Sequence, residues 1–273
     1  MTDPEPDDPD ADAARGVEVF VGSKHGVTAI EVRDREVRDY ALVHDCTTRD
    51  LARAPDGRVA VAASTDVFLE GADEYEATGF GPAVAVGGDP LHAAAPDGRL
   101  AAWYEDDWEP VGTLAGDVNA IDGDLIATDA GVFRVTDGSI QHVGLDRVAD
   151  VSTAGVPHAA TDRGLFTLGA GWMTAVEGEF SLVEADPTTA EAGVLRRAHA
   201  ATPDQLYVYD GEEWGPWHIP VDAPVTGIGY AAAVFAVSAD GTLITAYEGE
   251  WQTRHLGLSG VTALVVRPPE ENA

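Results

Sequence analysis

The sequence predicts an all-β fold, a seven-bladed β-propeller with four-stranded blades. A short phrase recurs seven times in the 273 residues: an apolar stretch, a tight turn and a further apolar residue. The residues that close successive copies stand 32 to 41 positions apart, a period typical of repeated supersecondary units. Each unit offers three clear strands and a weaker one before them, which matches the blade of a propeller.

The seven phrases share a turn that is rich in Asp. They lie at residues 22–27, 64–67, 95–100, 128–132, 161–165, 202–206 and 238–243. Six of them carry an aspartate: Asp66, Asp97, Asp129, Asp162, Asp204 and Asp240. Asp at a tight turn accepts hydrogen bonds from backbone amides, and Gly after it adopts positive φ. We therefore expect these aspartates to be framework rather than chemistry.

A second mark follows each phrase, where a turn with Gly or an acid leads into the outermost strand. Tryptophan opens that strand in four units, at Trp108, Trp172, Trp214 and Trp251. Tyr75, Ile140 and Val37 fill the same slot in three others. One bulky side chain per repeat indicates packing between successive sheets rather than a binding site.

The strand count is informative at the two ends of the chain. Near-continuous apolar segments at 59–63 and 234–237 predict inner strands that are buried on both faces. The first unit begins directly at its second strand, 17–21, so it lacks an innermost one. The spare strand at 261–266 would complete that blade and close the ring, which removes an open sheet edge.

These elements predict one propeller domain over residues 15–268. Residues 1–14 combine carboxylates and prolines without an aromatic, which is typical of a disordered acidic tail. Residues 269–273 are expected to be a short disordered end. Two blades are longer than the rest, through an extended inner strand and turn at 46–56 and a loop at 188–195.

Charge is the unusual part of the composition. Asp and Glu number 48 against 16 Lys and Arg, which gives a formal net charge of −32. The acid is spread through every repeat, and Lys24 is the single lysine. This composition is the expected surface of a protein that lives in molar salt, while the alternative is an acidic protein that binds a basic partner. Scattered arginines disfavour nucleic-acid binding, which needs clustered cations.

Compartment and cofactors follow from what the sequence lacks. Cys46 is alone, so no intramolecular disulfide is expected. The first residues do not read as a signal peptide, and no apolar run approaches a membrane span. We expect a soluble, monomeric, cytoplasmic protein that does not bind membranes. No motif for a metal, phosphate or nucleophile site appears, so neither cofactor nor metal is expected.

The turns and tryptophans resemble the degenerate Asp-box and kelch-like families. The nearest copy is the segment 161–166 followed by Trp172, although it lacks the full Ser-x-Asp-x-Gly-x-Thr-Trp consensus and the paired glycines of kelch. Taken with the acidity, the chain from about Val17 to Arg267 resembles a β-propeller family of haloarchaea. The resemblance implies the fold and the lineage and brings no activity.

One copy of the phrase breaks the rule, because Lys24 and His25 stand where the others carry Asp. In a propeller this turn shares a face with the connection between blades one and two. That connection holds four more reactive or charged residues: His44, Asp45, Cys46 and Arg49. These six residues form the candidate ligand site, where a small anion would bind and cations would lower the thiol pKa. The alternative is a buried structural Cys46 beside a solvated turn.

The leading functional hypothesis is a non-enzymatic scaffold that binds a protein or a small ligand at the loop face or the central opening. It rests on a regular repeat framework without a catalytic constellation. The alternative is a propeller hydrolase or lyase that uses the cluster around Lys24, His44 and Cys46. A sialidase-like site is disfavoured, because no spacing marks its arginine triad and Tyr-Glu pair.

Folding is predicted to depend on salt. Unscreened repulsion among the 48 carboxylates destabilises the compact state at low ionic strength, whereas molar salt screens it over a few ångströms. The melting temperature should therefore rise steeply between about 0.1 M and 2 M KCl. Equal melting curves by circular dichroism at the two concentrations would contradict adaptation to high salt.

Overall fold

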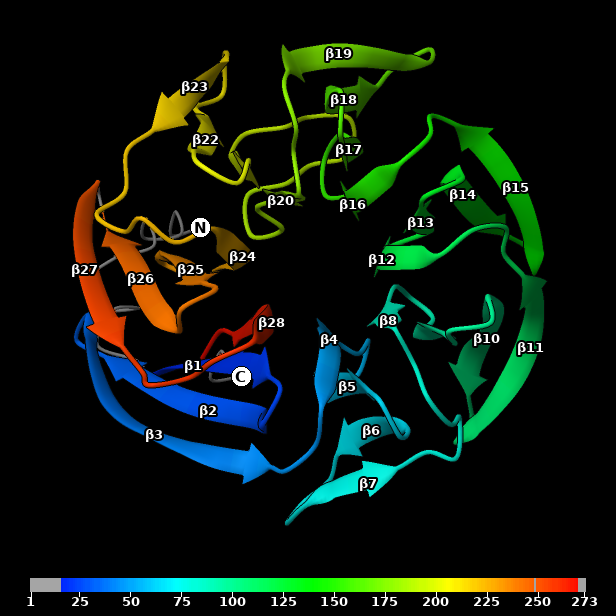
Figure 1. The fold of residues 1–273 in the computed structure, drawn as a ribbon, viewed down its shortest axis with the longest axis horizontal. Coiled ribbons are helices and arrows are strands. Elements are labelled where there is room, and N and C mark those ends of the chain that lie inside the picture. Colours follow the sequence, from blue (N-terminus) through cyan, green and yellow to red (C-terminus); the bar gives the residue numbers. More distant parts are fainter. Residues whose placement is uncertain (1–15, 248, 270–273) are drawn as a thin grey trace, which may run out of the picture.

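The computed structural model describes residues 16–247 and 249–269, which form a ring of seven antiparallel sheets around a central opening (Figure 1). It contains 28 strands, four to each sheet. No helix in this part of the chain is long and apolar enough to cross a bilayer. The tails expected at 1–14 and 269–273 lie outside the described residues, apart from Pro269.

Each blade runs from an innermost strand at the opening to an outermost strand at the rim. Blade 1 comprises β28 (Val261–Arg267), β1 (Val17–Ser23), β2 (Gly26–Arg33) and β3 (Glu36–His44). Blade 2 comprises β4 (Thr48–Arg53), β5 (Val59–Ala63), β6 (Val67–Glu70) and β7 (Tyr75–Ala77). Blade 3 comprises β8 (Ala85–Gly87), β9 (His92–Ala94), β10 (Arg99–Tyr104) and β11 (Asp107–Thr113).

The remaining four blades repeat this order along the chain. Blade 4 comprises β12 (Val118–Asp122), β13 (Leu125–Thr128), β14 (Gly131–Thr136) and β15 (Ser139–Gly144). Blade 5 comprises β16 (Val148–Ser152), β17 (His158–Thr161), β18 (Gly164–Leu168) and β19 (Trp172–Glu177). Blade 6 comprises β20 (Leu182–Ala185), β21 (Ala198–Ala201), β22 (Leu206–Tyr209) and β23 (Trp214–Trp217). Blade 7 comprises β24 (Val225–Tyr230), β25 (Val234–Ser238), β26 (Thr242–Tyr247) and β27 (Glu250–His255).

The last strand closes the ring, as the sequence predicts. β28 pairs antiparallel with β1, and Val19 faces Val266 while Val21 faces Leu264. Blade 1 is therefore built from both ends of the chain, and its inner edge is paired rather than open. The seven-bladed architecture with four-stranded blades is confirmed.

The alternation of antiparallel strands gives the ring two distinct faces. The connection face carries the turns between second and third strands, such as 24–25, and the connections between blades, such as 45–47. The hairpin face carries the turns from first to second and from third to fourth strands, including the long 186–197 loop of blade 6. Two-residue turns there have positive φ, as at Glu105 (48°) and Asp106 (63°), which suits the twist of hairpins.

Neighbouring blades are held together at the rim by the residue that opens each outermost strand. Trp108 Nε1 donates to Thr78 Oγ1 of the preceding blade at 3.0 Å, and Trp172 Nε1 donates to the Val143 carbonyl at 3.0 Å. In the other five blades the residue at this position makes an apolar or ring contact with the preceding blade. The pairs are Trp214 with His158, Trp251 with Trp217, Tyr75 with His44, Ile140 with Gly112, and Val37 with the core cluster that contains Phe235. The slot thus joins each blade to the one before it.

Loss of one such contact should destabilise the ring measurably. In Trp172→Phe the Val143 carbonyl loses its donor, which costs about 1–2 kcal/mol of unfolding free energy. The adjacent Met173 is 55% exposed, so Met173→Ala should stay within about 0.5 kcal/mol of the wild type. Denaturant unfolding at fixed high salt measures both, and equal stability of the two variants would contradict the role of the slot.

Candidate functional site

The seven innermost strands surround the ring axis (Figure 1), and they line a channel of about 420 Å³. Every one of β4, β8, β12, β16, β20, β24 and β28 contributes to its wall. Four carboxylates line it: Asp50, Asp122, Asp150 and Glu184. Arg49 and Arg53 of β4 are the cationic residues among the described lining. The channel is therefore a polar space in which acidic side chains outnumber the cationic ones among the described lining residues.

Asp50 and Asp150 occupy the same position in β4 and β16. Each follows a one-residue irregularity in pairing with the second strand, so both side chains leave their sheets in the same direction. Asp50 accepts the Leu51 amide at 2.8 Å and the Val86 amide of the next blade at 3.0 Å. Asp150 accepts the Val151 amide at 2.9 Å and the Val183 amide of the next blade at 2.8 Å. Each carboxylate ties two innermost strands together.

Burial outweighs these hydrogen bonds in the protonation of both groups. Burial raises the pKa of Asp50 to about 7, against the stabilising effect of the Val86 and Leu51 amides. Burial raises the pKa of Asp150 to about 8, and the charges of Asp122 and Asp50 add to the effect. The effect of Asp122 and Asp50 on the pKa of Asp150 shows that these three carboxylates lie close enough to interact.

Asp122 and Glu184 extend this charge toward the hairpin face. Asp122 Oδ2 accepts the amide and hydroxyl of Thr153 in blade 5, at 2.6 and 2.7 Å. Burial raises the pKa of Glu184 well above its ordinary value, and Asp122, Asp150 and Asp186 raise it further. Within the described part of the chain the Glu184 carboxylate has no hydrogen-bond donor, unlike the other three.

A buried polar network of Tyr230 and His199 holds the backbone carbonyl of Glu184. The hydroxyl of Tyr230, a residue of the channel wall, donates to the Glu184 carbonyl at 2.9 Å. That hydroxyl lies 2.7 Å from His199 Nδ1, so Nδ1 is the protonated nitrogen and Nε2 is left unpaired. Burial lowers the pKa of His199 to about 3, with a contribution from Arg197, so the ring is neutral. The network fixes β20 without adding positive charge to the channel.

The structure distributes the six residues of the candidate ligand site over several places. The 24–25 turn does touch the blade 1–2 connection, because a Cβ on Gly26 would lie 1.9 Å from the His44 carbonyl. Lys24 instead leans on the blade 7–1 connection, where its amide donates to the Gly260 carbonyl at 3.0 Å. His25 and Asp45 are exposed on the connection face, and Arg49 lines the channel.

The expected reactivity of Cys46 is a point for correction. Its thiol packs with the apolar cluster between blades 1 and 2 and lies 3.4 Å from Thr48 Oγ1. Burial raises the thiol pKa and the Asp45 charge adds to this, so the predicted lowering is wrong. The centroid of the His44 ring lies 4.4 Å from that of Phe68 and 5.1 Å from that of Tyr75, with the rings tilted, and burial lowers the pKa of His44. Ligand binding by this cluster stays a prediction.

Three of the six repeated turn aspartates, Asp66, Asp129 and Asp162, reach beyond their own turns. Their contacts are as follows: Asp66 accepts the Val67 and Gly81 amides, Asp97 that of Arg99, Asp129 that of Asp117, and Asp240 that of Thr242, while Asp162 pairs with Arg147 and Asp204 borders a small pocket of about 170 Å³. Gly98 and Gly241 follow two of them with φ of 82°, as the turn chemistry requires.

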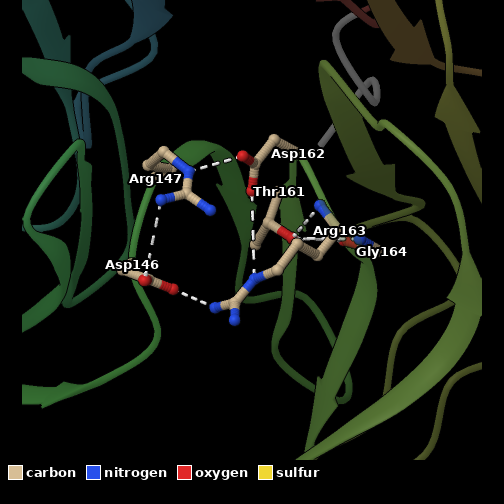
Figure 2. A network of polar contacts seen from close by, with 6 residues as sticks. All are labelled: Asp146, Arg147, Thr161, Asp162, Arg163 and Gly164. Carbon is tan, nitrogen blue, oxygen red and sulfur yellow. Dashed lines mark hydrogen bonds and ion pairs between the residues drawn. The ribbon is translucent and has the colours of Figure 1, made fainter.

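The blade 5 turn is also held by the hydroxyl of Thr161, the residue before its aspartate (Figure 2). The buried Thr161 hydroxyl donates to the Gly164 carbonyl at 2.9 Å and accepts the Arg163 and Gly164 amides at 3.1 Å. Asp162 is thereby free to bind Arg147, while Arg163 binds Asp146, and the four exposed side chains form a ring across the blade 4–5 connection. Such a surface network contributes modestly to stability.

The channel carboxylates themselves were missed by sequence reasoning. They sit in the weak innermost strands, where only the adjoining apolar residues Leu51, Val151 and Ala185 mark the strand. The available signal was an acid next to an apolar residue in the innermost strand of several repeats at once. Because burial of a charge is expensive, that placement indicates a polar interior rather than a solvated face.

Seven four-stranded blades around an acidic channel define the class of this protein as a seven-bladed β-propeller. The model of the HVO_0234-like β-propeller family matches residues 10–267, and the chain belongs to that family. A comparison with curated proteins found no match.

Three solved structures show how far the fold extends. A chain of the nidogen/laminin complex is similar with a TM-score of 0.61 and 7% identity, over 92% of this chain and 98% of that one. The WD40 β-propeller domain of Doa1 is similar with a TM-score of 0.61 and 13% identity, over 78% of this chain and 84% of that one. YCF48 bound to D1 peptide is similar with a TM-score of 0.58 and 14% identity, over 83% of this chain and 94% of that one. At these identities the likeness shows the fold alone.

The raised carboxyl pKa values predict how stability varies with pH. Asp50 and Asp150 bind protons more tightly in the folded state, between their unfolded pKa near 4 and their folded values of about 7 and 8. Stability therefore increases as the pH falls from 8.5 to 5.5. Relief of general repulsion acts in the same direction, so the comparison needs a variant.

Asp150→Asn removes one titrating group from the channel and should flatten the dependence of the melting temperature on pH. We expect the rise between pH 8.5 and 5.5 to shrink by roughly 3 °C, about 1 kcal/mol for a chain of this size. Glu109→Gln removes an exposed charge on β11 and should leave the slope unchanged. An identical slope in all three proteins would show that Asp150 titrates as an ordinary surface acid.

Proposed function

We propose that this protein is a non-enzymatic binding scaffold whose central channel accepts a cationic group of its partner. The observation that carries the proposal is the set of four carboxylates that share one channel of about 420 Å³. The charges of Asp122 and Asp150 raise the pKa of Glu184, and those of Asp122 and Asp50 raise the pKa of Asp150, so a bound cation would relieve repulsion among them. Glu184 supports this most directly, because its carboxylate has no donor within the described residues.

The size and polarity of the channel favour a side chain over a folded surface. Its volume lies within the range of small-ligand sites, and a single lysine or arginine side chain fits such a space. The similar folds in the nidogen/laminin complex and in YCF48 bound to D1 peptide are consistent with a scaffold role for this architecture. An exposed Lys or Arg on a partner protein is the group that we propose for the channel.

The alternative enzyme reading has less support from the contacts. Cys46 is a protonated thiol in an apolar cluster, and His44 is packed between blades, so neither is poised for catalysis. The acidic channel also favours a cation over the small anion that the Lys24 cluster suggested. Within the same proposal we place the protein, as a monomer, in the cytoplasm of a halophilic cell, and the net charge of −32 supports this.

Titration with a minimal cation and its neutral analogue tests the channel. We expect N-acetyl-arginine amide to bind with millimolar affinity, and N-acetyl-citrulline amide to bind at least about fivefold more weakly because it lacks the charge. Glu184→Gln should weaken arginine binding by a similar factor, whereas Glu109→Gln and Cys46→Ser should not. Calorimetry at the lowest salt that preserves the fold measures all of these.

The pH dependence of the same titration gives a second readout. Binding should strengthen from pH 6 to pH 9, because Asp50 and Asp150, with pKa values of about 7 and about 8, ionise through this range. Equal binding of the citrulline analogue, or full affinity in Glu184→Gln, would overturn the proposal. Loss of binding in Cys46→Ser alone would favour the alternative site around Lys24 and His44.

A further inference from the structure

A second hollow, separate from the channel, lies on the hairpin face between blades 5 and 6. This blade 5–6 groove has a volume of about 560 Å³. Its wall includes the rings of His158, Tyr209 and Trp214, the aliphatic Val194, and the acids Glu212 and Glu213. Val194 belongs to the long 186–197 loop and is 41% exposed, an uncommon placement for a large apolar side chain.

Trp214 differs from the tryptophans that occupy the same slot in blades 3 and 5. The indole nitrogens of Trp108 and Trp172 donate to the preceding blade, but Trp214 makes no such bond in the described part of the chain. Its ring instead meets His158 at 5.7 Å and 67°, and Tyr209 at 5.6 Å and 50°. The three rings form an angled aromatic wall, half-buried at Trp214 and Tyr209.

The charge of the groove is negative and is placed beside this wall. Asp210 accepts the amides of Glu212 and Glu213 at 2.9 and 3.0 Å, which fixes the turn that carries the two acids. Burial lowers the pKa of His158 to about 4, so its ring carries no charge at neutral pH. Among the described residues that line the groove, none is Lys or Arg. A bound cation would meet no competing positive charge.

The far wall of the groove is held rigidly by the loop that supplies it. Arg197 pairs with the buried carboxylate of Asp186 at 2.6 Å and closes the base of the loop. The Gly193 amide donates to the Gly155 carbonyl of blade 5 at 3.0 Å, next to Val194. The groove is therefore built before any ligand arrives, which lowers the entropic cost of binding.

We propose that the blade 5–6 groove binds an alkylated ammonium group. Such a cation is weakly hydrated, so it enters an apolar site at lower cost than a primary ammonium. Aromatic faces attract it through their quadrupoles, and two adjacent carboxylates add Coulomb attraction. The channel, in contrast, offers carboxylate acceptors with Tyr230 as the single aromatic residue of its described lining, and suits hydrated Lys or Arg. The two sites thus select different cations.

Choline and its neutral isostere 3,3-dimethyl-1-butanol test the chemistry of the groove. At constant ionic strength we expect choline to bind in the millimolar range and the alcohol at least about fivefold more weakly. Glu212→Gln combined with Glu213→Gln should weaken choline binding about three- to tenfold. Glu250→Gln, an exposed acid before Trp251 in blade 7, is the matched control and should have no effect. Trp214→Leu should abolish binding.

The variants also separate this site from the channel. Glu184→Gln should leave choline binding unchanged, and the Glu212→Gln/Glu213→Gln variant should still bind N-acetyl-arginine amide. Because the two acids are exposed, that variant stays informative even if Trp214→Leu fails to fold, which the melting curve reveals. Equal affinity for choline and the alcohol, or unchanged affinity after loss of both acids, would overturn the proposal.

A peptide that carries trimethyllysine distinguishes a protein-borne group from a free amine. Tighter binding of this peptide than of choline would support the proposal with a modified side chain as ligand. Equal binding would support it with a free alkylammonium ligand. Binding of the unmodified lysine peptide as tight as that of the trimethylated one would overturn it, since the aromatic wall would then confer no selectivity.

Discussion

Contact between neighbouring blades is the constraint on which the rest of the structure depends. A four-stranded sheet buries its faces only against the next sheet, so each blade is stable only as part of the ring. The rim is joined by one bulky residue per blade, such as Trp172 against Val143. The centre is joined by polar side chains, such as Asp150 to Val183, or by glycine, as at Gly87, where a Cβ would lie 2.1 Å from the Ile121 carbonyl.

This division explains why an acidic channel is tolerated. Asp50, Asp122 and Asp150 each bind backbone or hydroxyl donors of the next blade, so their burial is repaid partly by closing the ring. The remaining desolvation cost of the charged carboxylates raises the pKa values of Asp50 and Asp150. Glu184 stands outside this arrangement, since its carboxylate closes no contact between blades. The cation that we propose for the channel would give this carboxylate a partner.

The sequence was sufficient for the fold because the fold is repetitive. Seven copies of one turn and seven filled rim slots average out the ambiguity of any single strand, and counting them located the closing strand β28. The channel was not predictable in the same way. Whether Asp50 faces solvent or the axis depends on a one-residue irregularity in β4, which shifts the side chain from one face to the other. Nothing local in the sequence marks that irregularity.

The unusual residues mislead for a related reason. Lys24 and Cys46 attract attention because each is the single residue of its type, yet their contacts are a backbone connection and an apolar cluster. The informative departure from the repeat is the 186–197 loop of blade 6. Its first residues Pro187 and Thr188 line the channel, and Val194 lines the blade 5–6 groove. The buried pair of Asp186 and Arg197 fixes the loop's base, so one insertion contributes to the walls of both the channel and the blade 5–6 groove.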